Sequence, residues 1–305
     1  MNKLIIITGQ TATGKTSLAF KLAQENNGVL INCDSRQIYK YLDIITGKDY
    51  NLISKNKIGL YDVIKPDEYF SSFDYVKLAL PLIKKIIKKG KTPIIVGGTY
   101  LYIKHLLYGV ETENIPPDWK LRKELGNKTV KELQKILTGV STQLINQLNQ
   151  SEKNNPQRLI RKIEILKSRA KGSHIQPRGL NMTLQSSKTN MAITLENKLS
   201  VKNLKIEFYG LKFKDKNLLR KTIKKRVEKR LKNGAVDEVK KLLEMGYTKK
   251  DPGLKTTGYQ QLIGHLEGVL DIDTTIQQWI NKEVQYAKRQ YTFMKKDKNI
   301  TWREI

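Results

Sequence analysis

The sequence predicts an α/β protein in which a mainly parallel sheet is flanked by helices and interrupted by an all-helical insertion. Short β-branched runs alternate with helical apolar patterns in residues 1–115, and a similar strand pattern returns in 201–305, which is typical of a parallel sheet. Between them, residues 116–169 show helical periodicity alone. We therefore expect a core from 1–115 and 201–305 and an insertion from 116–200. Its last part, 171–200, is rich in Ser, Thr, Asn and Lys and predicts little regular structure.

The first elements are a strand, a loop and a helix. Residues 4–8 (LIIIT) form a β-branched run that predicts a strand buried on both faces. The glycine-containing loop 9–16 follows, and apolar residues then recur at helical spacing. Residues 29–32 (VLIN) predict a second strand, which ends at the polar pair Asp34 and Ser35. Ligands of open α/β sheets bind at such carboxyl ends.

The later elements repeat this alternation. Residues 71–89 predict a helix, and 92–96 (TPIIV) predict a third buried strand that ends at 97–99 (GGT). After the insertion, 204–211 (LKIEFYGL) predict a strand that returns to the sheet. Helical patterns follow at 216–233, 235–245 and 274–296.

Composition allows a large core and favours a polyanionic partner. The chain has 305 residues, of which 39% are hydrophobic, which is enough to bury a core. Lysine and arginine total 57 against 29 acidic residues, so the formal net charge is +28. This excess suits a nucleic acid partner. The alternative is an AT-rich genome, which raises the share of lysine on an ordinary surface.

Cellular location is predicted from what the sequence lacks. Cys33 is the single cysteine, so no disulfide can form within the chain, as expected in a reducing cytosol. No apolar run reaches the roughly 18 residues of a membrane helix. We expect a cytoplasmic protein without a membrane partner.

Residues 9–16 (GQTATGKT) match the phosphate-loop pattern G-x-x-x-x-G-K-[ST]. In such loops backbone N–H groups cradle phosphate oxygens, and the positive end of the following helix points at the same place. Lys15 neutralises phosphate charge and the Thr16 hydroxyl can bind Mg²⁺. A glycine-rich turn without a ligand is the alternative, and Lys15 and Thr16 argue against it. The pattern does not identify the phosphate compound.

Two other strand ends and two basic segments each leave alternatives open. Asp34 can accept a proton or bind Mg²⁺, but Asp and Ser also favour helix caps. The glycines of 97–99 permit close approach to a ligand, or form a tight turn. Residues 156–161 (PQRLIR) and 287–291 (AKRQY) can contact a nucleic-acid backbone, or be solvated basic faces.

Together these segments resemble the tRNA dimethylallyltransferase (isopentenyl-diphosphate:tRNA transferase) family. The matching stretches follow the family's order and spacing, and they are GQTATGKT at 9–16, DSRQIYK at 34–40 with LDIITGK at 42–48, YDVIKP at 61–66, GGTYLY at 97–102, NNPQRLIR at 154–161, GYQQL at 258–262 and AKRQ at 287–290. The array covers most of the chain, apart from about 170–205.

The resemblance implies a P-loop-type core and a helical insertion that grips the anticodon stem-loop. It implies transfer of a dimethylallyl group from dimethylallyl diphosphate to the exocyclic amine of the adenosine 3′ to the anticodon, with Mg²⁺, by a monomer. The loop would bind this diphosphate and not ATP, through Gly9, Thr11, Ala12, Thr13, Gly14, Lys15 and Thr16, with Thr16 as the metal ligand.

The resemblance also implies roles for single residues. Asp34 matches the family's general base, and Thr99 and Lys15 complete the expected catalytic set. The expected tRNA contacts are Asp34, Ser35, Arg36, Gln37, Thr99, Arg122, Gln157, Arg158, Leu159, Ile160 and Arg161.

The chain departs from the family at several positions. Gln10 replaces a usual proline in the phosphate loop. Thr222 occupies the place of an arginine that contacts the diphosphate, for which Arg220, Lys221 or Arg226 are possible replacements. Residues 283–284 (EV) replace a common Thr-Arg before AKRQ.

Other functions remain open at this point. A small-molecule or nucleoside kinase would use 9–16 for ATP, but it does not explain the insertion, the basic helix or the charge. A prenyltransferase acting on free adenylate fits the length and the insertion poorly. A non-catalytic RNA-binding descendant is disfavoured by the intact Lys15, Thr16, Asp34 and Thr99.

Overall fold

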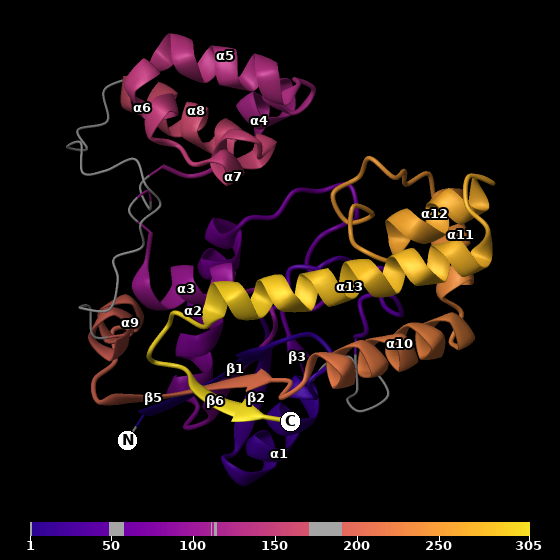
Figure 1. The fold of residues 1–305 in the computed structure, drawn as a ribbon. Coiled ribbons are helices and arrows are strands. Elements are labelled where there is room, and N and C mark those ends of the chain that lie inside the picture. Colours follow the sequence, from indigo (N-terminus) through magenta and orange to yellow (C-terminus); the bar gives the residue numbers. More distant parts are fainter. Residues whose placement is uncertain (1, 49–57, 111, 113–114, 171–190) are drawn as a thin grey trace. The chain divides into compact units, whose positions relative to one another are not determined.

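The computed structural model describes residues 2–48, 58–110, 112, 115–170 and 191–305. The chain divides into two compact units. The first comprises Met1–Leu107 and Thr189–Ile305 and contains the sheet, and the second comprises Tyr108–Lys188 and is helical in its described part (Figure 1). Among the described residues, no helix combines the length and the apolar composition that crossing a membrane requires.

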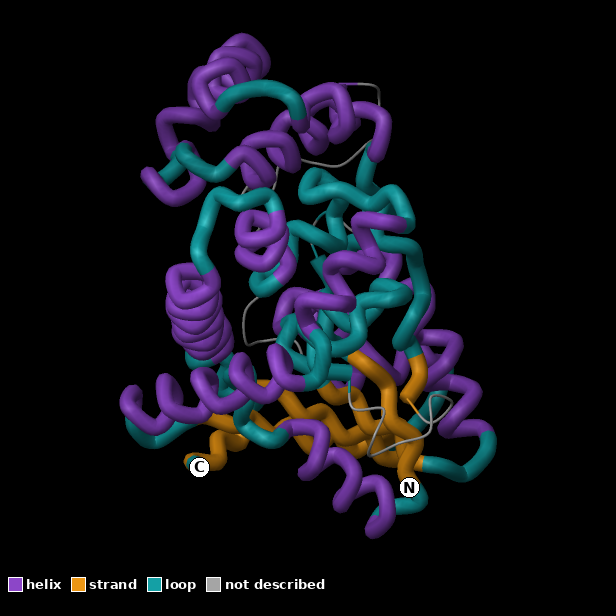
Figure 2. The backbone as a smooth tube through the Cα atoms, turned by 90° about the vertical axis from the view of Figure 1, so that its right-hand side faces the viewer, coloured by secondary structure: helices purple, strands orange, loops and turns teal. Residues whose placement is uncertain are grey.

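A six-stranded sheet forms the first unit's centre (Figure 2). Its strand order is β3-β2-β4-β1-β5-β6. Its strands are β1 (Asn2–Gly9), β2 (Gly28–Asn32), β3 (Ile58–Gly59), β4 (Thr92–Val96), β5 (Leu204–Lys212) and β6 (Thr301–Glu304). Every neighbouring pair is parallel, which confirms the predicted sheet. The edge strands β3 and β6 were not predicted, because neither contains a buried apolar run.

Both faces of the sheet are covered. Helix α1 (Lys15–Glu25) packs on one face, where Ala19 meets Ile5 and Ile7. Alternate residues of a strand point to opposite faces, so Leu4 and Ile6 point to the other side. Helices α2 (Ser72–Lys88) and α13 (Ile272–Met294) lie there (Figure 1). Burial on both sides explains the unbroken β-branched runs.

A second apolar core of this unit joins a long loop to the C-terminal helices. The remaining helices are α3 (Tyr100–Tyr108), α9 (Met191–Leu199), α10 (Lys216–Lys232), α11 (Ala235–Glu244) and α12 (Tyr259–Leu266). Ile38 and Leu42 of the loop pack with Trp279 and Tyr259 of α13 and α12. Neither α3 nor α12 was predicted. The expectation of little structure over 171–200 fails for α9, while 171–190 lie outside the described residues.

The second unit is built from short, capped helices. These are α4 (Trp119–Gly126), α5 (Val130–Val140), α6 (Thr142–Gln147), α7 (Gln150–Lys153) and α8 (Pro156–Ala170). Asp118, Thr129, Ser141 and Asn149 each accept a hydrogen bond from a backbone N–H of the first turn, as N-cap residues do. Leucines such as Leu133 fill its core. The predicted all-helical insertion is therefore present.

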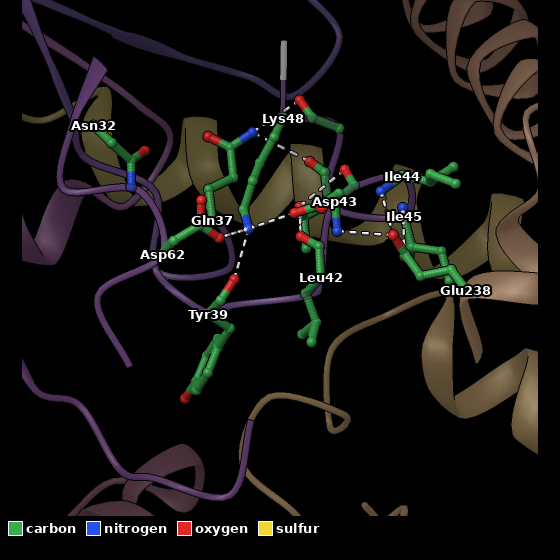
Figure 3. A network of polar contacts seen from close by, with 12 residues as sticks. Asn32, Gln37, Tyr39, Leu42, Asp43, Ile44, Ile45, Lys48, Asp62 and Glu238 are labelled. Atoms are coloured by element: carbon green, nitrogen blue, oxygen red, sulfur yellow. Dashed lines mark hydrogen bonds and ion pairs between the residues drawn. The ribbon is translucent and has the colours of Figure 1, made fainter. Parts of the chain in front are cut away.

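A buried lysine fixes the loop that follows β2 (Figure 3). The Lys48 side chain is 0% exposed. Its Nζ donates to the Tyr39 carbonyl at 2.6 Å, to Asp43 Oδ1 at 2.8 Å and to Asp62 Oδ1 at 2.7 Å. Gln37 Nε2 donates to the Gly47 carbonyl at 2.9 Å. The loop that begins at the predicted site segment is thus tied down from within.

Glu238 of α11 holds the same loop from the outside (Figure 3). Its carboxylate accepts hydrogen bonds from the backbone N–H groups of Asp43, Ile44 and Ile45, at 2.8, 2.6 and 3.1 Å. The Tyr259 hydroxyl donates to it at 2.6 Å. Bonds to a charged acceptor are the stronger class, so α11 and α12 add to the rigidity of the loop.

Lys48→Met should lower the free energy of unfolding by about 2–3 kcal/mol. The change leaves Asp43 and Asp62 without their shared cation, and the loss is below that of a fully buried pair because both carboxylates are one-third exposed. Urea unfolding of both proteins measures the difference. The exposed Lys77, changed to Met, is the matched control, and equal losses in the two variants would contradict the prediction.

Candidate functional site

The phosphate loop lies between β1 and α1 and has a backbone that glycine makes possible. Gly9 has a φ of +133°, and a Cβ there would lie 2.1 Å from the Leu211 carbonyl oxygen. Ala12 and Gly14 also have positive φ, of 66° and 75°. Conformations of this kind turn successive N–H groups toward one concave side, which attracts anions. Helix α1 begins at Lys15, so its positive end adds to the attraction.

Side chains of the loop close over its own backbone. Lys15 Nζ donates to the Gln10 carbonyl at 2.6 Å, and Thr13 Oγ1 donates to the same oxygen at 2.7 Å. Thr16, the predicted metal ligand, is half-buried in the first turn of α1. The described residues contain no group of three or more His, Cys, Asp or Glu that could hold a metal. A single hydroxyl beside a phosphate site fits Mg²⁺, which takes many of its ligands from phosphates and water.

Gln10, at a position where the resemblance implies a proline, attaches the phosphate loop to two distant elements. Its Oε1 accepts from the Phe213 N–H at 2.8 Å, just beyond β5. Its Nε2 donates to the Ala287 carbonyl of α13 at 3.3 Å. The amide is 6% exposed. Two long-range hydrogen bonds therefore hold the loop where a proline ring would restrict it.

The carboxyl ends of β2 and β4 bring Asp34, Ser35 and Thr99 together. Thr99 donates its backbone N–H to the Cys33 carbonyl at 3.1 Å. Its Oγ1 accepts from the Ser35 N–H at 2.8 Å and donates to Ser35 Oγ at 3.1 Å. Asp34 Oδ1 accepts from the Arg36 N–H at 3.0 Å. These predicted site residues thus form one cluster.

Glycine leaves space beside the Asp34 carboxylate. A Cβ built on Gly98 would lie 3.6 Å from Asp34 Oδ2 and 2.3 Å from Gln290 Nε2. Gly97 is more restricted still, since a Cβ there would lie 2.1 Å from the Cys33 carbonyl oxygen. Gly97 therefore permits a close approach of the β2 and β4 loops, and Gly98 permits a close approach of the Gln290 side chain.

Cys33 contributes no reactive group to this cluster. Its side chain is buried, and burial holds the pKa of the thiol well above its usual value. The thiol is therefore protonated and inert at neutral pH.

Gln290 of α13 joins the phosphate loop to the Asp34 edge. Its Oε1 accepts from the Thr11 N–H at 2.8 Å, and its Nε2 donates to the Gly98 carbonyl at 3.1 Å. Sequence reasoning considered AKRQ for its cations, yet Lys288 and Arg289 are exposed and Gln290 is buried. Gln290 lies at helical spacing from other buried residues of α13, and this spacing was the signal in the sequence that its side chain is buried.

Arg226 of α10 reaches the phosphate loop from the other side. Its Nη1 donates to Thr11 Oγ1 at 2.5 Å. Arg220 instead donates to Asn281 Oδ1 at 3.0 Å, and the Thr222 hydroxyl donates to Leu218 within its own helix at 2.8 Å. Lys221 is exposed. Arg226 is therefore the one of the three candidate cations that the structure places at the loop.

A buried charge cluster lies beside these residues. Arg36 Nη1 donates to Glu283 Oε1 at 3.2 Å, and its guanidinium stacks on the Tyr286 ring at 3.9 Å. Arg230 Nη1 lies 3.8 Å from the same carboxylate oxygen. Burial opposes ionisation of Glu283, but Arg36, Arg230 and Arg226 outweigh it and hold the pKa of Glu283 below its usual value.

Within this cluster, the environment of Arg230 is the least favourable for a charged side chain. The residue is 6% exposed, and among the described residues its Nε and Nη1 have no hydrogen-bond partner. Burial and the neighbouring Arg226 lower the pKa of Arg230 to about 9, despite the opposing charge of Glu283. This cluster was not predicted from the sequence, because its members come from distant segments of the chain.

The predicted tRNA contacts of the helical unit fall into two groups. Gln157 and Arg158 are exposed at the start of α8. Leu159 and Ile160 are 0% and 9% exposed and pack in the core of the unit. Neither apolar side chain is available on the surface of this unit.

Arg122 and Arg161 of the helical unit are paired internally. Arg122 donates to both oxygens of Glu164, at 2.9 and 2.7 Å. Arg161 donates to Glu164, to Thr112 Oγ1 at 2.9 Å and to the Ile115 carbonyl at 2.7 Å. Glu164 is buried, but these bonds hold the pKa of Glu164 below its usual value. Both arginines therefore organise the segment that leads into α4.

Comparison with known proteins gives a consistent result. A family model described as IPP transferase matches residues 37–297. The chain is 34% identical to a tRNA dimethylallyltransferase of Acetivibrio thermocellus over 99% of this chain and 91% of that protein. It is 32% identical to one of Thermotoga maritima over 98% and 92%.

Solved structures agree with this result. The crystal structure of a full-length tRNA isopentenylpyrophosphate transferase from Bacillus halodurans is similar with a TM-score of 0.67 and 28% identity, over 100% of this chain and 90% of that one. A eukaryotic dimethylallyltransferase acting on tRNA has a TM-score of 0.72 at 23% identity, over 100% and 74%, and supports the fold. The family model and the curated relatives cover nearly the whole chain, so the protein belongs to the IPP transferase family.

Proposed function

We propose that this protein transfers a dimethylallyl group from dimethylallyl diphosphate to the exocyclic amine of the adenosine 3′ to the anticodon in tRNA. The observation that carries the proposal is the Gln290 bridge, which fixes a phosphate loop beside a carboxylate. A prenyl transfer needs a site that holds the diphosphate and a base that lies at the same edge of the sheet. Membership of the family supports the same reaction over phosphoryl transfer.

The phosphate loop holds the diphosphate in this proposal. Its backbone N–H groups and the positive end of α1 face the phosphates. Lys15 and Arg226 neutralise the charge that grows on the leaving group as the C–O bond breaks. Thr16 would hold Mg²⁺, which supplies further charge neutralisation at the diphosphate.

Asp34 serves as the general base. The adenine amine is a weak nucleophile because its lone pair is delocalised into the ring. As the nitrogen bonds to the allylic carbon, diphosphate departs and the amine proton passes to the Asp34 carboxylate. The Ser35–Thr99 hydrogen bonds orient the loop that holds this carboxylate. The adenine has to leave its stack to reach the site.

The helical unit holds the anticodon stem-loop in this proposal. Gln157 and Arg158 are exposed and contact RNA directly, while Leu159, Ile160, Arg161 and Arg122 shape the unit from within. Ser35, Arg36 and Gln37 contribute from the Asp34 loop. The net charge of +28 favours the phosphate contacts that dominate such binding.

A single-turnover assay tests the proposed function. Unmodified stem-loop RNA with adjacent adenosines 3′ to the anticodon is mixed with radiolabelled dimethylallyl diphosphate, Mg²⁺ and the protein, with ATP in a parallel tube. Label should enter the RNA without ATP. Phosphate transfer from ATP, without prenyl transfer, would establish a kinase instead.

Asp34→Asn should reduce turnover in this assay by roughly 10²–10⁴-fold while RNA binding persists, because the amide cannot accept the amine proton. The exposed Asp67, changed to Asn, is the control and should retain full turnover. A turnover of Asp34→Asn equal to that of the control would remove Asp34 from the mechanism.

Arg226→Gln should raise the KM for dimethylallyl diphosphate by about 10–100-fold, which corresponds to the loss of one charge-assisted hydrogen bond to the phosphates. Arg220→Gln on the same helix is the matched control, because Arg220 bonds to Asn281 away from the loop. Initial rates over a range of diphosphate concentrations measure both. The assignment fails if the two variants change the KM equally.

A further inference from the structure

The residue that replaces the common family threonine, Glu283, contacts the segment of the proposed base. Its side chain is 3% exposed and lies on the face of α13 that also carries Tyr286 and Gln290. Its carboxylate pairs with Arg36, which is two residues from Asp34, at 3.2 Å. A buried acid thus lies behind the reacting edge, in a place where the resemblance predicts a neutral side chain.

Arg36 has two acidic neighbours. Its backbone N–H already donates to Asp34 Oδ1 at 3.0 Å. The charges of both Glu283 and Asp34 contribute to the raised pKa of Arg36, against the effect of burial. In the structure the guanidinium is held by Glu283 and by the face of Tyr286, 3.9 Å from the ring centroid, and its hydrogen bond goes to Glu283.

We propose that Glu283 is a positioning residue that holds the Arg36 guanidinium against Tyr286 and so keeps it off the Asp34 carboxylate. The inference rests on the proposed function, in which Asp34 takes the adenine proton. A carboxylate in a forked pair with arginine has its oxygens occupied and its proton affinity lowered. With Glu283 present, the carboxylate stays available to the amine.

The neighbouring charges make this competition strong. From α13, Glu283 and Tyr286 face Arg36, and from α10, Arg226 and Arg230 add positive charge behind it. Glu283 and Asp34 are the carboxylates that act on the charge of Arg36, and Asp34 lies on the same segment as Arg36. Removal of Glu283 leaves Asp34 as the acid to which Arg36 can turn.

Glu283 also balances Arg230, so its removal alone has a structural effect. Arg230 lies 3.8 Å from the same oxygen, and among the described residues its Nε and Nη1 have no hydrogen-bond partner. A buried charge that loses its partner destabilises a protein strongly, whereas an apolar residue of similar volume in its place is tolerated. Glu283→Gln therefore needs to be combined with Arg230→Met.

The test uses Glu283→Gln, Arg230→Met and the double variant in the single-turnover assay. Saturating RNA and dimethylallyl diphosphate separate turnover from binding, and thermal unfolding follows stability. We expect Glu283→Gln to unfold earlier and the double variant to recover the midpoint of Arg230→Met. The turnover of the double variant should nevertheless stay about 10–100-fold below that of Arg230→Met. Removing a general base costs roughly 10²–10⁴-fold, and here the base is still present but paired with Arg36. Glu283→Asp, which keeps the charge, should restore most of the turnover.

A coupling measurement shows whether Glu283 acts through Arg36. Arg36→Met is combined with Arg230→Met, with and without Glu283→Gln. Without a guanidinium at position 36, the Glu283→Gln change should no longer lower turnover. Such loss of an effect in one background is the signature of a direct interaction.

Two results would overturn the inference while the proposed function stands. One is full turnover of the double variant, which would make Glu283 only the partner of Arg230. The other is an undiminished effect of Glu283→Gln when Arg36 is absent. Failure of the wild-type protein to prenylate RNA would instead overturn the proposed function, and this inference with it.

Discussion

The site depends on one glutamine that bridges two loops. Strands β1 and β4 are neighbours in the sheet, so the phosphate loop and the Gly97–Gly98 turn begin at the same edge. Loops that leave a sheet are free to diverge, and Gln290 removes this freedom by bonding to Thr11 and to Gly98 at once. Its helix, α13, is far along the chain. Folding of the C-terminal segment is therefore required before the phosphate loop and the Asp34 edge can be held at a fixed separation.

Electrostatics adds a second constraint on the same place. Lys15 and Arg226 contact the phosphate loop, and Arg36 and Arg230 lie beside Glu283. Burial removes hydration from these cations and brings them close to one another, so the pKa of Arg230 falls to about 9 through burial first and the charge of Arg226 second. Glu283 is the acid that contacts both Arg36 and Arg230. It lets the cluster persist before an anionic substrate arrives, and it decides which carboxylate Arg36 contacts.

The sequence predicted features whose residues are contiguous and missed those that depend on distant partners. The runs 4–8 and 92–96 and the loop 9–16 each contain their own signal, because burial on both faces and phosphate binding impose local patterns. Strand β3 has only two residues, so no periodicity exists to detect it. Gln290 and Arg226 take their meaning from Thr11, which lies 279 and 215 residues away along the chain. In α8, Leu159 was expected to contact tRNA but is packed in the core of the helical unit, and the pairing of Arg161 with Glu164 has no signature in the sequence.

The departures from the family pattern are compensated in the structure. The side chain of Gln10 restricts the phosphate loop through hydrogen bonds to Phe213 and Ala287, where a proline would restrict it through its ring. Thr222 satisfies its hydroxyl within α10, and Arg226, one turn further along, reaches the loop. Val284 is 7% exposed and joins the apolar core between α10 and α13, so it contributes packing at the position where the resemblance implies an arginine. Each substitution leaves the loop, the bridge and the Asp34 edge in place. A chain released from catalysis would have no reason to retain this arrangement, which argues against a purely RNA-binding descendant.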